Sequence, residues 1–191
     1  MIVDTESGAE QAVDYLLSHD ILGVDTETKP SFKKGTTPNL VSLLQVATHD
    51  CCILFRLNKI GMTPAIIRFL EDTTVKKVGL SWHDDIHSLM KRATFTPGYF
   101  VDVQSLVSKI GVKDLSLRKL YANLFHKRIN KRQQLSNWDR NVLDEKQKLY
   151  AATDAWTCII IYEEIERLLA NGDYELVVTN QEKEKEDKDE L

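Results

Sequence analysis

The fold is decided by the stretch Ile21-Leu22-Gly23-Val24-Asp25-Thr26-Glu27-Thr28. Its apolar beginning is typical of a buried strand, and side chains alternate between the two faces along a strand. Asp25 and Glu27 therefore point the same way, while Thr26 points the other way. Two adjacent carboxylates repel each other unless one is protonated or both bind a cation. The stretch indicates a cation site at the end of a strand. The alternative is that Asp25 caps a turn and Glu27 is solvated, and the rest of the chain has to decide between them.

Length and composition favour a single α/β domain, because the chain has 191 residues, of which 42% are hydrophobic. We expect this domain to span residues 1–175. Residues 176–191 form a charged tail, in which positions 182–190 hold six acids and three lysines. Such a composition cannot bury a core, so we expect disorder there.

The cysteines and the chain termini bear on the cellular compartment. Cys51, Cys52 and Cys158 lack metal-ligand spacing and are interpreted as reduced core residues. No signal peptide or membrane span is recognisable, so we expect a cytosolic or nuclear protein and no membrane partner. The final Lys188-Asp189-Glu190-Leu191 spells an endoplasmic reticulum retention signal. Without a signal peptide we interpret it as fortuitous.

The order of the expected elements predicts a mixed five-stranded sheet with helices on both faces. Thr63-Pro64 is a helix-start signature, and residues 29–38 form a basic loop by their Pro, Gly and Ser content. Strands are expected at 21–28, 41–47, 51–55, 75–80 and 100–101, the second and third forming a hairpin, and helices at 7–19, after Thr63, and at 83–92, 103–110, 115–125 and 144–170.

Two further segments supply acids that complete the site. Tyr150 and Asp154 are four residues apart in the final helix, which puts them on one face. Asp85 follows the fourth strand, where the loops at the strand ends of an α/β sheet meet in one crevice. Oxygen donors without patterned His or Cys favour Mg²⁺ or Mn²⁺ over Zn²⁺. Four carboxylates could hold two ions about 4 Å apart, the arrangement used in phosphodiester cleavage.

Three motifs in this order resemble those of a known enzyme family. Asp25-Thr26-Glu27, Lys77-Val78-Gly79 through Asp85, and Tyr150-Ala151-Ala152-Thr153-Asp154 are similar to the exonuclease motifs of the DEDDy 3'-5' exonucleases. These are the ribonuclease D and Werner-type branch of the ribonuclease H-like superfamily. The resemblance spans roughly residues 3–170. Ser136-Asn137-Trp138 and the 148–155 run are most similar to the Werner-type members, and Trp156 departs from the tyrosine often found in relatives.

The resemblance implies a fold, an activity and a set of catalytic residues. It implies a ribonuclease H-like α/β fold and a metal-dependent 3'-5' exonuclease that releases nucleoside 5'-monophosphates, with DNA favoured and RNA 3'-end trimming as the alternative. Asp25, Glu27, Asp85 and Asp154 would ligate two divalent ions, Mg²⁺ or Mn²⁺. Tyr150 would orient the attacking water, since a phenol with an ordinary pKa near 10 is a poor base at neutral pH.

A local excess of positive charge indicates where nucleic acid would bind. The net charge is -4, yet Arg118 to Arg132 holds six basic residues and no acid. A solvated helix face explains each of these residues equally well when it is taken singly. The candidate nucleic-acid contacts are Thr26, Thr28, Lys33, Lys34, Trp82, Lys127, Arg128, Lys131 and Arg132.

Several alternatives remain open from the sequence. Asp84 could replace Asp85 as the ligand, although the spacing from Lys77-Val78-Gly79 favours Asp85. His83 and His87 are four residues apart but lack a third zinc ligand, and we interpret them as structural or near the substrate. Trp82 and Trp138 could stack on bases but more often such residues pack in a core, and Asp102 and Asp139 are expected to be helix caps. A non-catalytic nucleic-acid-binding module is the competing function, and it would gain nothing from four repelling carboxylates.

Overall fold

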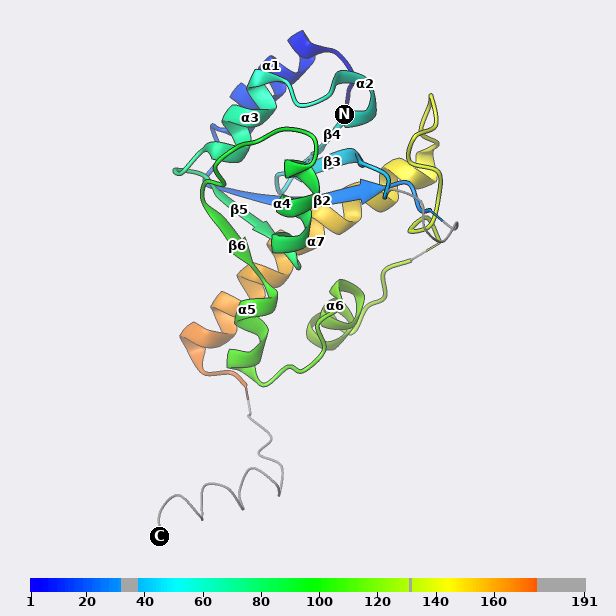
Figure 1. Cartoon of the computed structure of the whole chain (residues 1–191). Coiled ribbons are helices and arrows are strands. Elements are labelled where there is room, and N and C mark those ends of the chain that lie inside the picture. The colour runs from blue at the N-terminus through cyan, green and yellow to red at the C-terminus, as the bar shows by residue number, and fades with distance from the viewer. Residues whose placement is uncertain (32–37, 131, 175–191) are drawn as a thin grey trace.

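A twisted mixed sheet forms the centre of the computed structural model, which describes residues 1–31, 38–130 and 132–174 (Figure 1). The sheet has six strands in the order β1-β4-β3-β2-β5-β6. β2 pairs antiparallel with β3 and parallel with β5. The strands are β1 (Ile2–Val3), β2 (Ile21–Thr28), β3 (Val41–Ala47), β4 (Cys52–Phe55), β5 (Lys76–Gly79) and β6 (Phe100–Asp102).

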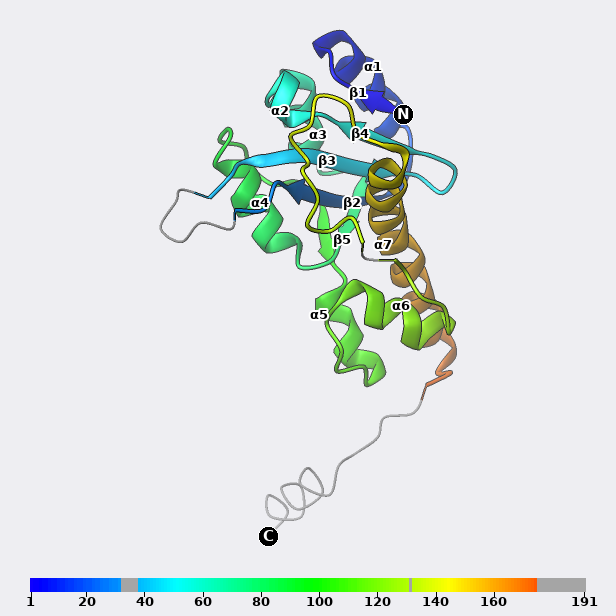
Figure 2. The ribbon, with the colours of Figure 1, turned by 90° about the vertical axis from the view of Figure 1, so that its right-hand side faces the viewer.

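Helices cover both faces of this sheet, as predicted. α1, α3 and α4 lie on the face to which β2 contributes Leu22 and Val24. The long α7 crosses the other face, where Ala155 and Ile159 pack with Ala47 of β3. Figure 2 shows α7 running along the sheet and continuing past it to contact α6. The helices are α1 (Glu6–Leu16), α2 (Leu57–Ile60), α3 (Pro64–Glu71), α4 (Trp82–Met90), α5 (Gln104–Val107), a 3₁₀ turn (Ser108–Ile110), α6 (Leu117–Phe125) and α7 (Glu145–Asn171).

Local chemistry explains where the helices begin. Thr63 accepts a hydrogen bond from the Ile66 amide at 3.3 Å, and Pro64 occupies the first turn of α3. α7 begins with a capping box, in which Asp144 accepts from the Gln147 amide and Gln147 accepts from the Asp144 amide. Gly172 then ends α7 in the left-handed conformation. The start of α3 at Thr63-Pro64 was predicted from the sequence, whereas the capping box of α7 was not identified there.

The structure corrects several details of the sequence interpretation. The sheet has one strand more than the five that were predicted. The strand missed is β1, which has only two residues and so shows no alternation of polar and apolar side chains; β1 pairs parallel with β4. The four-residue α2 was also missed. Cys51 is exposed rather than in the core, whereas Cys158 is buried; all three cysteines are free. Asp139 caps no helix and instead accepts a hydrogen bond from Ser42 at 2.7 Å.

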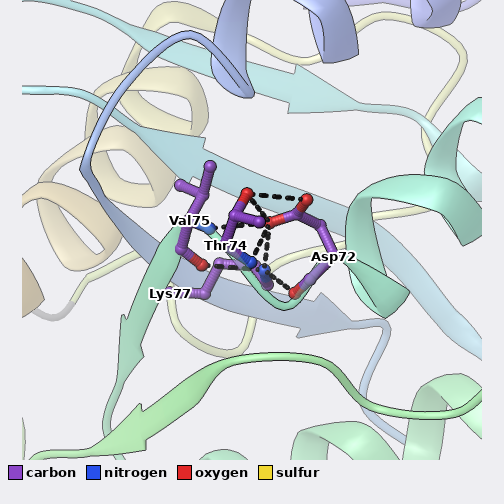
Figure 3. A network of polar contacts seen from close by, with 4 residues as sticks. All are labelled: Asp72, Thr74, Val75 and Lys77. Atoms are coloured by element: carbon purple, nitrogen blue, oxygen red, sulfur yellow. Dashed lines mark hydrogen bonds and ion pairs between the residues drawn. The ribbon is translucent and has the colours of Figure 1, made fainter.

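A buried lysine fastens the start of β5. Lys77 is fully buried, and its ammonium donates to the carbonyls of Asp72 at 2.7 Å and Val75 at 3.0 Å. The Asp72 carboxylate lies 3.7 Å from the same nitrogen and also accepts from the amides of Thr74 and Val75 (Figure 3). Burial lowers the Lys77 pKa, and Asp72 opposes that effect. This network closes the turn between α3 and β5, the strand that leads to Asp85.

Two predictions from the sequence concern a membrane span and the C-terminal tail. Within the described residues, none of the helices combines the length and apolar character that crossing a membrane requires. The expected disordered tail from residue 176 and the Lys188–Leu191 ending lie outside the described residues.

Candidate active site

β2 presents Asp25 and Glu27 toward α7, because odd-numbered positions of the strand face that helix. Gly23 lies on the same face, where a side chain would collide with the Ala155 carbonyl. The missing side chain lets α7 pack directly on the strand, and Asp154 immediately precedes Ala155. Carboxylate oxygens of Asp25, Glu27 and Asp154 lie within 4.8 Å of one another. Three of the four acids that the sequence analysis expects to converge therefore lie together.

Asp85 approaches β2 from α4, on the other side. Its Oδ1 accepts a hydrogen bond from the Thr26 hydroxyl, because Thr26 faces the layer that contains α4. The structure therefore does not place Asp85 within the group of three carboxylates. Its charge still raises the pKa of Asp25. Thr26, which the sequence analysis names as a nucleic-acid contact, is engaged with Asp85.

Burial and mutual repulsion make this group of acids hard to ionise. Burial, followed by the charges of Asp85 and Asp154, raises the Asp25 pKa well above its usual value. Burial, with Asp25 as the next cause, raises the pKa of Glu27 to about 10. Burial also raises the pKa of Asp85 to about 6 and that of Asp154 to about 6. A bound cation removes the cost of ionising such acids.

The oxygen atoms of these acids also suit a hard divalent ion. The buried Oδ1 of Asp154 has no hydrogen-bond partner among the described residues. An orphaned carboxylate oxygen is costly to bury, and it lies beside two further carboxylates with no imidazole or thiolate in the group. Oxygen donors alone are what Mg²⁺ and Mn²⁺ prefer. The donor set therefore fits such an ion.

Tyr150 lies one turn before Asp154 on α7, at the boundary between two cavities. The first has a volume of about 510 Å³ and contains Asp25, Glu27, Asp154 and Arg118 in its lining. Burial and the charge of Asp154 raise the Tyr150 pKa above its usual value. The phenol consequently stays protonated at neutral pH and acts as a hydrogen-bond donor.

The second cavity, of about 470 Å³, adjoins the first at Tyr150. Three residues from the predicted basic stretch line it, namely Lys127, Arg128 and Arg132, all of them exposed. Tyr121, Lys146 and Trp156 also line this cavity and were not identified from the sequence. For Trp156 the departure from the relatives' tyrosine was the available signal.

The remaining predicted nucleic-acid contacts fall into three groups. Trp82 is 2% exposed and stacks on Phe100 at 5.3 Å between ring centroids, so it offers no face to a base and is removed from the candidates. Thr28 ends β2, partly buried, beside an irregularity in the register. Lys33, Lys34 and Lys131 lie outside the described residues.

The segment just before α7, residues 136–138, packs against Tyr150 and bonds to the first turn of that helix. Trp138 is fully buried and lies 6.1 Å from the Tyr150 ring, so the core role weighed for Trp138 is the one observed. Gln147 donates to the Ser136 hydroxyl at 2.8 Å and to the Asn137 carbonyl at 3.2 Å. The Ser136-Asn137-Trp138 motif thus anchors the loop that leads into α7.

A second network holds the turn that carries Asp85. Ser81 has a positive φ of 57°, a strained conformation for a residue other than glycine. Its amide donates to Asp102 at 3.0 Å, and its hydroxyl donates to Gln104 at 3.1 Å. Asp102 also accepts from the Gln104 amide at 3.0 Å. The prediction of Asp102 as a helix cap was wrong, because the N-cap of α5 is Val103. Asp102 instead fixes two loops at the strand ends, a role that no local sequence pattern indicated.

Comparisons with known proteins agree with this geometry. Residues 1–170 match a family model described as 3'-5' exonuclease. Over 154 residues the chain is 29% identical to the bifunctional 3'-5' exonuclease/ATP-dependent helicase WRN of Mus musculus, covering 78% of this chain and 11% of that protein. Over 152 residues it is 30% identical to a 3'-5' exonuclease of Arabidopsis thaliana, covering 77% of this chain and 53% of that protein. The chain thus spans about half or less of the length of these relatives.

Solved structures share the fold. The EXO domain of Aedes aegypti Nibbler superposes with a TM-score of 0.79 at 23% identity, covering 91% of this chain and 90% of that one. Escherichia coli RNase D, described as an exoribonuclease involved in structured RNA processing, superposes with a TM-score of 0.75 at 16% identity. The match covers 87% of this chain and 45% of that one. At these identities the likeness establishes the arrangement of sheet and helices.

Proposed function

The chain belongs to the 3'-5' exonuclease family, and from its site we propose that it hydrolyses the terminal phosphodiester at the 3' end of nucleic acid. The observation that carries this proposal is the group formed by Asp25, Glu27 and Asp154, with oxygens within 4.8 Å of one another on the wall of a cavity of about 510 Å³. Acids that repel one another this strongly are best explained by a cation that they hold together.

We propose that the cofactor is a pair of divalent ions, Mg²⁺ or Mn²⁺. Asp25, Glu27 and Asp154 would hold the first, and Asp85, near Asp25, would contribute to the second. Bound divalent ions supply charge neutralisation at the reacting phosphate and lower the pKa of water. The Asp85–Thr26 hydrogen bond then fixes the orientation of the carboxylate that lies outside the group of three.

Tyr150 is the chain's own contribution to positioning the nucleophile. Its raised pKa keeps the proton on the phenol, so the hydroxyl donates a hydrogen bond and holds the water or the scissile phosphate. Water adds to phosphorus, and the 3' oxygen of the preceding nucleotide leaves and gains a proton. A nucleoside 5'-monophosphate is released. Trp138, packed behind Tyr150, keeps the ring in place.

The two adjoining cavities support a path for the strand. Arg118 lines the catalytic cavity, whereas Lys127, Arg128 and Arg132 line the neighbouring one, together with Tyr121 and Trp156. Basic side chains neutralise phosphates, and aromatic rings stack on bases. We assign the nucleotides that precede the scissile bond to this second cavity. Lys33, Lys34, Lys131 and Thr28 stay candidate contacts from the sequence.

DNA is the proposed preference, because the motifs are most similar to the Werner-type members and the 29% identity to mouse WRN agrees. RNA 3'-end trimming is the alternative, favoured by the structural likeness to RNase D. The catalytic domain at residues 1–175, the charged tail at 176–191 and a cytosolic or nuclear location stay predictions.

The decisive experiment uses 5'-labelled DNA and RNA strands of one sequence, with Mn²⁺, Mg²⁺ or EDTA. The variant Asp25→Asn removes a proposed ligand, and Asp50→Asn, in the exposed turn between β3 and β4, is the matched control. We expect metal-dependent shortening from the 3' end with the wild type and Asp50→Asn, and none with Asp25→Asn. Binding of either strand without shortening would instead favour the non-catalytic module. The faster-shortened strand identifies the preferred sugar.

A further inference from the structure

Two imidazole rings lie together on the exposed face of α4. His83 and His87 are four residues apart, one turn of the helix, and both side chains are exposed. Their ring centroids are 4.3 Å apart with an angle of 83° between the planes. Residues at this spacing on a helix project from the same face. The two rings therefore form a solvent-exposed pair whose proximity follows from their spacing along the helix.

The pair differs from two other histidines of the chain, His19 and His49, in what it contacts. His19 is hydrogen-bonded to the Tyr15 carbonyl at 2.9 Å, and His49 contacts the Glu163 carboxylate at 2.7 Å. Within the described part of the chain, neither His83 nor His87 has a recorded hydrogen bond or ion pair, and their contact is with each other. Their ring nitrogens are available to a ligand.

The pair is separate from the carboxylate site although Asp85 lies between the two histidines in sequence. At about 100° per residue, His83 and His87 are about 40° apart around the helix, while Asp85 is about 200° from His83. Asp85 points toward Thr26 on β2. A helix about 10 Å across separates the two positions, so one ion cannot bind both.

We propose that His83 and His87 form a second metal site, selective for borderline or soft divalent ions such as Zn²⁺, Cu²⁺ or Ni²⁺. Paired imidazoles suit these ions, whereas the all-oxygen group suits Mg²⁺ or Mn²⁺. Asp84 is exposed three residues before His87, where its charge would partly balance that of the ion, and the ligands from this chain are the two imidazoles. Water would complete the coordination. The bound ion would clamp the first two turns of α4, the helix that carries Asp85.

The test measures Zn²⁺ binding to the untagged full chain by calorimetry, with excess Mg²⁺ present and no nucleic acid. The wild type should bind one Zn²⁺ per chain, and His83→Gln or His87→Gln should weaken binding at least about tenfold. His126→Asn is the control, since His126 is an exposed histidine at the end of α6 with a φ of 56°, a conformation that Asn tolerates. Equal binding by all four proteins, or no binding by the wild type, overturns the proposal.

Two further measurements separate this site from the carboxylates. Cu²⁺ bound to the wild type should show coupling to two imidazole nitrogens in its electron paramagnetic resonance spectrum, and one in either single variant. Zn²⁺ should slow hydrogen exchange of the α4 amides in the wild type and in Asp25→Asn, but not in His83→Gln. Loss of these effects in Asp25→Asn would assign the ion to the carboxylates and contradict the proposal. None of these readouts depends on exonuclease activity.

Discussion

Gly23 of β2 and Ala155 of α7 are in such close contact that a Cβ atom on the glycine would lie 2.0 Å from the Ala155 carbonyl oxygen. The neighbouring carbonyl carbon would be 2.9 Å away. These are backbone atoms of a long helix, so they cannot move aside as the end of a side chain would. The approach sets the distance between Asp154 and the two carboxylates of β2.

Gly23→Ala should therefore disrupt stability and activity together. The added methyl group forces α7 away from the sheet, and overpacking of this kind costs about 1–3 kcal/mol or more. Displacing Asp154 should abolish metal-dependent cleavage. Gly8→Ala is the control, because its Cβ would meet side chains alone, those of Thr5 at 2.9 Å and Val3 at 3.6 Å, far from the site. Thermal unfolding and 3' shortening measure both effects, and an active Gly23→Ala protein would contradict this account.

Asp154→Asn should change how stability depends on pH in the metal-free protein. The unfolded pKa of Asp154 is its usual 3.8 and burial raises the folded value to about 6, so between these values the folded chain binds more protons. Its free energy of unfolding then falls as pH rises. The variant lacks this ionisation and should gain about 1–3 kcal/mol relative to the wild type between pH 4 and pH 7.

Urea unfolding in EDTA at both pH values measures this difference. Asp25, Glu27 and Asp85 are present in both proteins. Because the charge of Asp154 raises the pKa values of Asp25 and Glu27, the difference between the two pH profiles reports the ionisation of Asp154 together with this repulsion. Adding Mg²⁺ should restore stability to the wild type at pH 7 and have less effect on the variant. Parallel pH profiles for the two proteins would show that Asp154 ionises normally.

Tyr150→Phe should lower kcat by roughly a hundredfold, the range observed when one positioned donor is removed. The ring and its packing against Trp138 remain, so the melting temperature should stay close to that of the wild type. KM for a single-stranded oligonucleotide should change much less than kcat. Tyr121→Phe, in the neighbouring cavity, serves as the control for kcat. A kcat unaffected by loss of the Tyr150 hydroxyl would remove it from the proposed chemistry.

Thr26→Val should weaken metal dependence without unfolding the protein. Valine keeps the shape of threonine but removes the hydroxyl that donates to Asp85. Loss of such an orienting partner costs roughly 10–100-fold in metal affinity or activity. Titrating activity against Mg²⁺ measures the shift in the concentration that gives half the maximal rate. Thr28→Val, on the same strand, should leave that concentration unchanged.

Lys77→Met should destabilise the fold by about 1–3 kcal/mol while leaving the site chemistry intact. Methionine fills much of the volume but removes the ammonium that bonds the Asp72 and Val75 carbonyls (Figure 3). The Asp72 carbonyl keeps the Tyr99 amide as a donor at 2.9 Å, so the cost of about 1–3 kcal/mol for an unsatisfied buried group falls on the Val75 carbonyl. Chemical unfolding of Lys77→Met and of the exposed-site control Lys109→Met tests this. Equal stability would mean that the buried charge gives no net stabilisation.

The features that depend on local periodicity could be predicted from the sequence. The two-residue repeat of β2 placed Asp25 and Glu27 on one face, and the turn of α7 placed Tyr150 with Asp154. The caps at Thr63 and Asp144 follow from hydrogen bonds within three residues. These rules hold without reference to the rest of the chain, so the acids and the helix boundaries could be predicted.

Contacts between segments that are distant in sequence could be known from the folded structure alone. It turned Asp85 toward Thr26, buried Trp82 against Phe100, and brought Asp102 to the strained turn at Ser81. It also paired the two-residue β1 with β4 and set Tyr150 between two cavities. Residues far apart in sequence meet only when the sheet and its helices pack, and no local pattern encodes which side chain a given neighbour will contact.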